Sequence, residues 1–263
     1  MIRLPLTLLI TALSATCHAQ VSELVHAGTG ELPVILTAPH GGTQAVPGCG
    51  ERTAVGSRFV TGPDHNTDRL ARGIADELKR LTGKTPYLVI ARFHRKYIDA
   101  NRSAGEAYGS PECAAEYEAY HAAIRRFVDD MRTKYPNAML FDIHGQVALR
   151  GSILRGTRYG STVKALLARA GAPAVTGPDS VFGRFAAMGY AILPANDAAP
   201  TDRVEAKNYS GGHTVEIYGS NRTDGIDAIQ LEFGRDLREG AALDKTAKDT
   251  AQAIAVFYER FLK

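Results

Sequence analysis

Two histidines and a glutamate stand at the ends of short apolar runs that predict strands. The runs and their residues are Val34–Ala38 with His40, Ala138–Asp142 with His144, and Ala228–Phe233 with Glu232. In open α/β sheets, ligands bind outside the carboxyl ends of the strands. We therefore expect the three side chains to share one crevice. Histidine and carboxylate side chains are the protein ligands of many catalytic zinc sites, which keep a further position for water.

A carboxylate near His40 is needed to complete such a centre. The segment "GPDHNTDRLA" offers Asp64 and Asp68 at the start of a predicted helix. Aspartate at this place more commonly caps a helix or offsets its dipole, so spacing alone leaves both residues open. Asp142 precedes His144 by two positions and shares its face of the strand, where it could orient the histidine.

The elements that position these residues alternate along the chain. Apolar runs predict six strands: Val34–Ala38, Tyr87–Ala91, Ala138–Asp142, Tyr190–Leu193, Thr214–Tyr218 and Ala228–Phe233. Apolar residues at helical spacing predict three long helices: Asp64–Leu81, Glu112–Tyr135 and Asp244–Leu262. Alternation of this kind predicts a single-domain α/β fold with a mainly parallel or mixed central sheet and helices on both faces.

The start of the chain predicts export. Residues 1–19 carry a basic Arg3, an apolar stretch from Leu4 to Ala15 and small residues at the cleavage spacing, the pattern of a secretory signal peptide. Its apolar part is too short to span a bilayer. We therefore expect a periplasmic or secreted catalytic domain over residues 20–263, with no membrane insertion after the signal is removed.

The net charge limits the possible binding partners, and the cysteines predict a disulfide. The formal net charge of +3 includes Arg3 and is too balanced to favour nucleic acid. Cys49 and Cys113 are the two cysteines outside the signal segment, and an oxidising compartment favours a disulfide between them. If both loops leave the same end of the sheet, this bridge closes over the rim of the crevice.

Six motifs resemble the N-formylglutamate amidohydrolase family and occur in its order. They are "PHGG", "DHNTDRLA", "RKYIDANR", "FDIHG", "SGGHTVEIYG" and "AIQLEFGRDLR". The resemblance runs from about His40 to Arg238. It implies the zinc carboxypeptidase (phosphorylase/hydrolase-like) fold, shared with aspartoacylases, and one Zn²⁺ ion. It also implies hydrolysis of an amide bond beside an acidic group by metal-activated water.

The resemblance also implies roles for individual residues. His40, Asp64 and His144 correspond to the metal ligands, with Asp64 preferred over Asp68 because the family places its carboxylate just before the helix. Glu232 corresponds to the general base, and the pair Asn101 and Arg102 to the residues that grip a substrate carboxylate. Arg95 could stabilise the tetrahedral oxyanion or hold a second acidic group.

Three alternatives remain open for the function. "HGG" near a strand end is also similar to zinc amidases that cleave peptidoglycan stem peptides. Poly-γ-glutamate, an extracellular polymer of carboxylates, would suit both the arginines and export. The partner is thus a small acidic amide or an acidic peptide or polymer. The third alternative is a non-enzymatic metal- or acid-binding module on a degenerate hydrolase fold. Glu232 distinguishes this module from an enzyme, because a binding module needs no base.

Overall fold

The computed structural model describes residues 22–53 and 59–263, and the predicted signal peptide at 1–19 lies outside them. Within the described part of the chain, no helix is long and apolar enough to cross a membrane.

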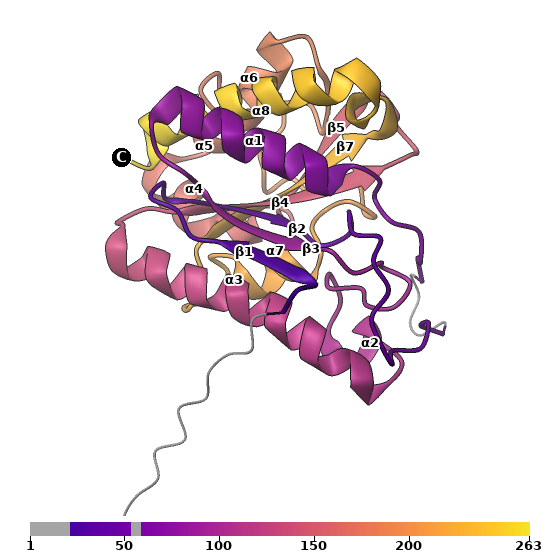
Figure 1. The fold of residues 1–263 in the computed structure, drawn as a ribbon. Coiled ribbons are helices and arrows are strands. Elements are labelled where there is room, and N and C mark those ends of the chain that lie inside the picture. The colour runs from indigo at the N-terminus through magenta and orange to yellow at the C-terminus, as the bar shows by residue number, and fades with distance from the viewer. Residues whose placement is uncertain (1–21, 54–58) are drawn as a thin grey trace, which may run out of the picture.

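In the described residues, seven strands form one mixed sheet (Figure 1). They are β1 (Val25–Gly28), β2 (Val34–Ala38), β3 (Tyr87–Ala91), β4 (Met139–Gln146), β5 (Ser152–Gly156), β6 (Ala191–Leu193) and β7 (Asp227–Gly234). Their order across the sheet is β1-β3-β2-β4-β7-β5-β6. The central strands β3, β2, β4 and β7 are parallel, whereas β1 runs antiparallel to β3 and β5 antiparallel to β7. Four parallel strands thus end at one edge of the sheet.

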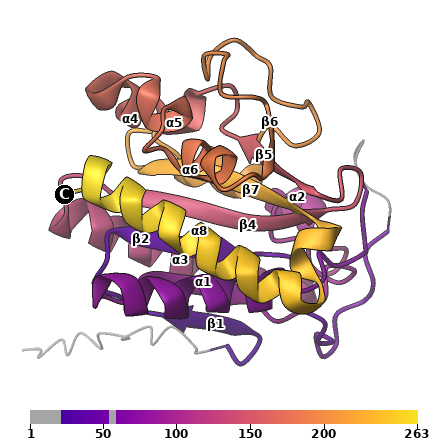
Figure 2. The same cartoon turned by 90° about the horizontal axis from the view of Figure 1, so that it is seen from above.

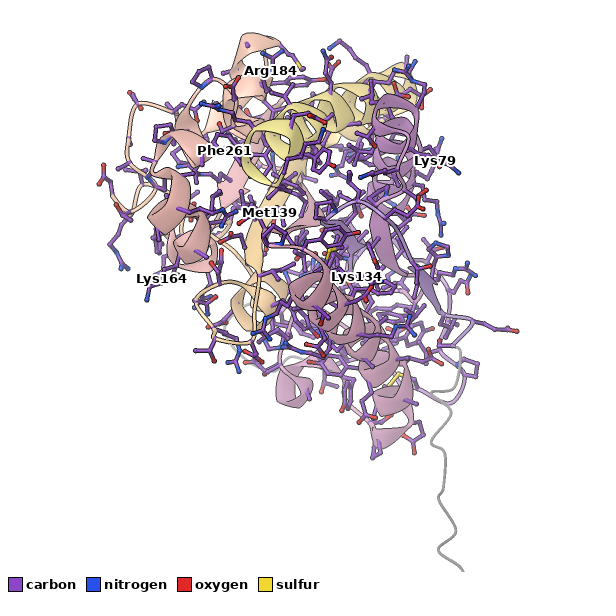
Figure 3. All side chains as sticks on the ribbon, turned by 90° about the vertical axis from the view of Figure 1, so that its left-hand side faces the viewer. Lys79, Lys134, Met139, Lys164, Arg184 and Phe261 are labelled. Atoms are coloured by element: carbon purple, nitrogen blue, oxygen red, sulfur yellow. A yellow bond between two sulfur atoms is a disulfide. The ribbon has the colours of Figure 1, made fainter. Side chains whose placement is uncertain are left out.

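Helices cover both faces of this sheet (Figures 1 and 2). They are α1 (Thr67–Thr82), α2 (Ala104–Ala107), α3 (Ala114–Lys134), α4 (Lys164–Ala170), α5 (Pro173–Thr176), α6 (Val181–Ala187), α7 (His213–Tyr218) and α8 (Gly240–Phe261). α1, α6 and α8 pack on one face, and α3 and α7 on the other. Figure 3 labels Lys79 in the last turn of α1, Lys134 at the end of α3 and Met139 at the start of β4.

Each face of β2 contributes to a separate core. Val34 and Leu36 pack with the apolar stripe of α1 and with α8, while Ile35 packs with Ile124 and Phe127 of α3. All five residues of β2 are buried. Burial on both faces explains why the strand is a continuous apolar run rather than an alternating one.

The structure confirms the α/β class and most of the predicted elements. Two predicted strands, Val34–Ala38 and Tyr87–Ala91, have the observed bounds. β4 is longer than the predicted run Ala138–Asp142, so that His144 lies inside the strand rather than beyond it. The strands β1, at one edge of the sheet, and β5, between β7 and β6, were not predicted, because each is short and interrupted by polar residues or glycine.

The prediction of a strand at Thr214–Tyr218 is wrong, because this segment forms the helix α7. Its β-branched residues favour a strand, but five residues are too few to separate the two periods. Val215 and Tyr218, three positions apart, both pack against the α3 side of the core. The backbone N–H of Thr214 donates a hydrogen bond to Oδ1 of Asn101 at 2.8 Å, which fixes the start of the helix.

The predicted disulfide between Cys49 and Cys113 is present, with 5.0 Å between the Cα atoms. It joins the loop after β2 to the start of α3. Backbone bonds already bring this loop close to the segment after β3, since the N–H of Arg52 donates to the carbonyl of Lys96 at 2.8 Å. The disulfide therefore links the loops that follow two neighbouring parallel strands.

Replacing both cysteines by serine is expected to lower the free energy of unfolding by about 4 kcal/mol, because the bridge restricts the unfolded chain. Its two residues are 64 positions apart. Urea unfolding of the oxidised protein and of the double variant measures the difference. Equal unfolding midpoints would show that the disulfide adds no stability.

Candidate active site

The site residues predicted from the sequence line one cavity at the carboxyl ends of the parallel strands. Its volume is about 610 Å³. The predicted residues on its wall are His40, Asp64, Arg95, Asn101, Arg102, His144 and Glu232. They come from five separate segments of the chain, which the fold brings together.

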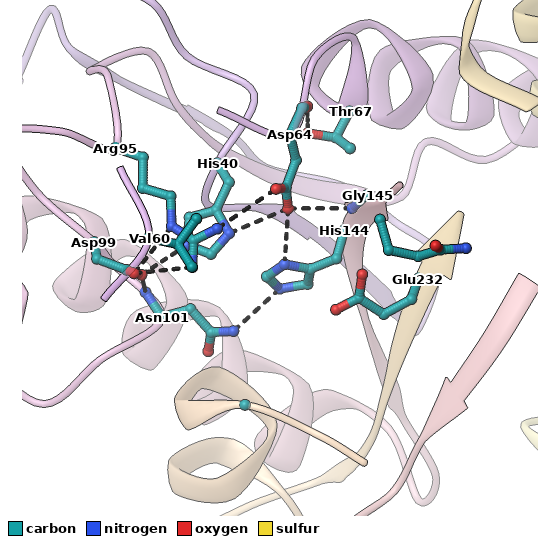
Figure 4. Close-up of polar contacts among 12 residues, drawn as sticks. His40, Val60, Asp64, Thr67, Arg95, Asp99, Asn101, His144, Gly145 and Glu232 are labelled. Carbon is teal, nitrogen blue, oxygen red and sulfur yellow. Dashed lines mark hydrogen bonds and ion pairs between the residues drawn. The ribbon is translucent and has the colours of Figure 1, made fainter. Parts of the chain in front are cut away.

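Two histidines and an aspartate converge in this cavity (Figure 4). Oδ2 of Asp64 lies 3.2 Å from Nδ1 of His40 and 3.3 Å from Nδ1 of His144. One ligand atom from each residue lies within 4.8 Å of the other two. The three side chains are almost fully buried. Imidazole nitrogens and a carboxylate oxygen form a donor set that suits zinc, so these residues could hold a metal ion.

The outer nitrogen of each histidine is held by a further carboxylate. Nε2 of His40 donates to Oδ1 of Asp99 at 2.7 Å, and Nε2 of His144 donates to Oδ2 of Asp142 at 2.8 Å. The hydroxyl of Thr37 in turn donates to Asp142 at 2.5 Å. Carboxylates behind metal-binding histidines fix the ring orientation and leave the other nitrogen facing the metal. This arrangement is a second reason why the cluster fits a metal ion.

The charges of the cluster depend on one another. Burial alone would raise the pKa of Asp64, but hydrogen bonds from His144 and His40 hold it far below its ordinary value. Burial would likewise lower the pKa of His144, but the carboxylate of Asp142 raises it well above its ordinary value. The protein therefore stabilises the anionic carboxylate that a cation site requires.

Asp64 rather than Asp68 faces the two histidines. The N–H of Asp64 donates to the carbonyl of His40 at 2.9 Å, and its own carbonyl accepts the hydroxyl of Thr67 at 2.8 Å. These bonds place Asp64 just before α1, with its side chain turned toward the cavity. Asp68 lies in the first turn of α1 and is not part of the metal-binding group in the described chain.

Glu232 faces the cluster from the neighbouring strand. It is the register partner of His144 in the parallel pair β4 and β7, so that both side chains leave the same face of the sheet. Nε2 of Gln230 donates to its Oε1 at 2.8 Å. Burial raises the pKa of Glu232 to about 7, and the nearby charge of Asp64 adds to this effect. A carboxylate of this kind can accept and release a proton near neutral pH.

The predicted arginines occupy different places. Arg95 binds the anions of the cluster, since its Nη2 lies 3.0 Å from Oδ2 of Asp99 and its Nη1 lies 3.5 Å from Oδ1 of Asp64. Arg102 is half-buried on the cavity wall, and its Nη1 donates to the carbonyl of Asn101 at 2.7 Å. Nδ2 of Asn101 lies 3.3 Å from Nε2 of His144. Asn101 thus lies between Arg102 and His144 on the wall of the cavity.

Asp99 and Gln230 were not predicted to belong to the site. Asp99 stands within "RKYIDANR", but no spacing in the sequence shows that it lies behind His40. Gln230 precedes Glu232 by two positions in the same strand, as Asp142 precedes His144. The side-chain period of two could have identified Gln230 as a partner of Glu232.

Asp99→Asn is expected to weaken zinc binding by about 10–100-fold, the usual cost of altering a carboxylate behind a metal-binding histidine. The amide cannot stabilise the charge that His40 shares with a bound cation. Competition with a fluorescent chelator measures the affinity. Unchanged affinity would limit Asp99 to its ion pairs with Arg95 and Arg52.

No protein-family model matches the sequence, and no curated protein matches it. Among solved structures, the fold is similar to that of N-formylglutamate amidohydrolase from Ralstonia eutropha JMP134. The two share 16% identity with a TM-score of 0.61, covering 90% of this chain and 97% of that one. A gene product of Agrobacterium tumefaciens is similar at 15% identity with a TM-score of 0.54, covering 90% and 92%. The chain therefore has the fold of N-formylglutamate amidohydrolase, as its motifs predict.

Proposed function

We propose that this protein is an exported zinc-dependent hydrolase that cleaves an amide bond next to a glutamate-like carboxylate. The observation that carries the proposal is the convergence of His40, Asp64 and His144 with Glu232 in one buried cavity. The shared fold with an N-formylglutamate amidohydrolase supports the same reaction class. Export rests on the signal-like pattern of residues 1–19.

The residues fit a single zinc ion held by His40, Asp64 and His144. Asp99 and Asp142 fix the two rings so that each Nδ1 faces Asp64. When bound in such a site, zinc lowers the pKa of water to about 7 and so provides a nucleophile at neutral pH.

Glu232 acts as the general base and then as the general acid. Its Oε1 is occupied by Gln230, so Oε2 is the oxygen that takes the proton from the attacking water. With a pKa of about 7, the acid that results can pass this proton to the leaving nitrogen. Arg95, which already pairs with Asp64 and Asp99, adds positive charge where the oxyanion develops.

The positions of Arg102 and Asn101 favour a substrate that carries a carboxylate. Both lie on the cavity wall beside the metal cluster, and Arg102 is half-buried. A guanidinium recognises a carboxylate through two parallel hydrogen bonds, which also fix the orientation of the substrate.

The size of the cavity admits more than one acidic substrate. Its volume of about 610 Å³ falls within the range of about 300–1,000 Å³ that is common for small-molecule sites. An N-acyl-glutamate fits within this space, as does the end of poly-γ-glutamate or of a peptidoglycan stem peptide. Such extracellular polymers would agree with export.

Hydrolysis assays with a substrate panel test this proposal. The purified protein, loaded with zinc, is incubated with N-formylglutamate, N-acetylglutamate, a γ-glutamyl oligomer, a stem peptide and the neutral amide analogue of each. We expect hydrolysis of at least one acidic compound, in preference to its neutral analogue. Zinc binding without hydrolysis of any compound would support a binding module instead.

Arg102→Ala is expected to lower kcat/KM for the best acidic substrate by about 100-fold, because charge-assisted bonds to its carboxylate are lost. Kinetics with the matched neutral amide give the comparison, since that compound never forms these bonds. An equal loss on both compounds would assign Arg102 a structural role, through its bond to the Asn101 carbonyl.

A further inference from the structure

Arg238 is a buried arginine whose guanidinium bonds to backbone carbonyl groups. Only 3% of the residue is exposed. Its Nε donates to the carbonyl of Phe233 at 3.0 Å, its Nη2 to that of Gln146 at 3.3 Å, and its Nη1 to that of His65. Within residues 22–53 and 59–263, none of its hydrogen bonds goes to a carboxylate, and the charges of Asp64 and Glu232 act on it through space. Buried arginines are usually paired with an anion, so this arrangement needs an explanation.

The three carbonyl groups belong to the three segments that carry the proposed chemistry. Phe233 follows Glu232 in β7, and His65 follows Asp64 before α1. Gln146 lies two residues after His144 at the end of β4. One planar group therefore joins the backbones next to the base, the carboxylate ligand and a histidine ligand.

Gly145 brings the same guanidinium close to the metal cluster. The backbone N–H of Gly145 donates a hydrogen bond to Oδ2 of Asp64 at 3.1 Å. A Cβ atom at this position would lie 2.4 Å from Cζ of Arg238, so only glycine leaves room for the guanidinium. The φ angle of Gly145 is not in the left-handed region, and the requirement is one of space alone. Arg238 thus packs directly on the peptide that holds Asp64.

The backbone of Arg238 is held as well. Nδ2 of Asn66 donates to its carbonyl at 2.9 Å, which adds a second link to the segment before α1. The fixed planar array of N–H donors on arginine can serve three acceptors at once. Lysine, a point charge on a flexible stem, cannot reproduce this geometry.

We propose that Arg238 is a positioning residue, which sets the placement of Asp64, His144 and Glu232 relative to one another through their backbones. This inference rests on the proposed function, in which these residues hold zinc and transfer a proton. Arg238 also lies on the wall of the cavity, but all three nitrogen atoms of its guanidinium donate to carbonyl groups, so its role is to hold the ligands and the base rather than to bind the substrate. Misplacing reacting groups by about 1 Å can lower a rate by about 100-fold.

Arg238→Lys and Arg238→Met test this role. We expect both variants to bind zinc about 10–100-fold more weakly and to lose about 100-fold in kcat. KM is expected to stay within about twofold, because the substrate-binding residues are not displaced. The lysine variant keeps the positive charge. A loss of zinc affinity and kcat in both variants therefore shows that the planar guanidinium is required, and not its charge alone.

Arg169→Met is the matched control. Arg169 also anchors β7 but at its opposite end, where its Nη1 lies 2.7 Å from Oδ2 of Asp227. This variant is expected to lower the melting temperature while zinc affinity and kcat stay at wild-type values. Arg238 variants that likewise lose only melting temperature would overturn the positioning role.

Gly145→Ala gives a second test that does not remove the arginine. Its Cβ displaces the guanidinium, so we expect the same loss of zinc affinity as in the Arg238 variants. In the Arg238→Met background the added methyl group should cost much less, because the two changes disrupt one contact. Full additivity would overturn the proposal. Wild-type protein that binds no zinc would overturn the proposed function itself, whereas wild-type binding that none of these variants alters would overturn only the role of Arg238.

Discussion

Glu232→Gln is expected to lower kcat by about 10²–10⁴ while zinc affinity and the melting temperature remain at wild-type values. Glutamine keeps the size of the side chain and can still form a hydrogen bond to Gln230, but it cannot take a proton from water. The expected loss of kcat is large because Glu232 faces His144 from the adjacent strand. With a pKa of about 7, its side chain can both accept the proton from water and release it to the leaving nitrogen.

Glu259→Gln is the control for this experiment. Glu259 is exposed on α8, and its Oε2 accepts a hydrogen bond from Nζ of Lys263 at 2.5 Å. Its removal should leave kcat unchanged. Steady-state kinetics and zinc titration of both variants, side by side, separate proton transfer from general effects of charge. Wild-type turnover in Glu232→Gln would leave Glu232 as a structural residue.

Asp64→Ala is expected to abolish stoichiometric zinc binding, whereas Asp68→Ala retains it. Oδ2 of Asp64 lies between the two histidine nitrogens, so its removal takes away a ligand and leaves two imidazoles that hold zinc weakly. The loss should exceed the roughly 10–100-fold effect of altering an outer carboxylate.

Zinc content after dialysis, measured by atomic absorption, decides between the two aspartates. The pair is well matched, because both residues precede or begin α1 and both substitutions remove one carboxylate. Loss of zinc in Asp68→Ala with full retention in Asp64→Ala would contradict the assignment.

Residues at the ends of buried strands could be placed from the sequence, because those strands leave a clear pattern. β2 and β3 are apolar on both faces, which fixes their bounds and therefore the position of His40. The same reasoning paired His144 with Asp142, since the side-chain period of two holds along β4.

The contacts that complete the site depend on tertiary structure and could not be predicted in this way. Asp99 meets His40 only because the segment after β3 folds beneath the cavity. The helix α7 has the local pattern of a strand, and its start depends on a bond to Asn101, which is distant in the sequence. Arg238 has the local sequence pattern of a surface cation in "GRDLR", although the structure buries it.

Zinc titration of the metal-free protein, followed by hydrolysis of its best acidic substrate, tests the central claim most directly. Activity should rise in proportion to added zinc, level off at one equivalent per chain and disappear again when a chelator is added. His144→Ala, assayed in parallel, should neither bind zinc tightly nor gain activity. Hydrolysis by the metal-free protein that zinc does not increase, or full zinc-dependent activity in His144→Ala, would contradict the account.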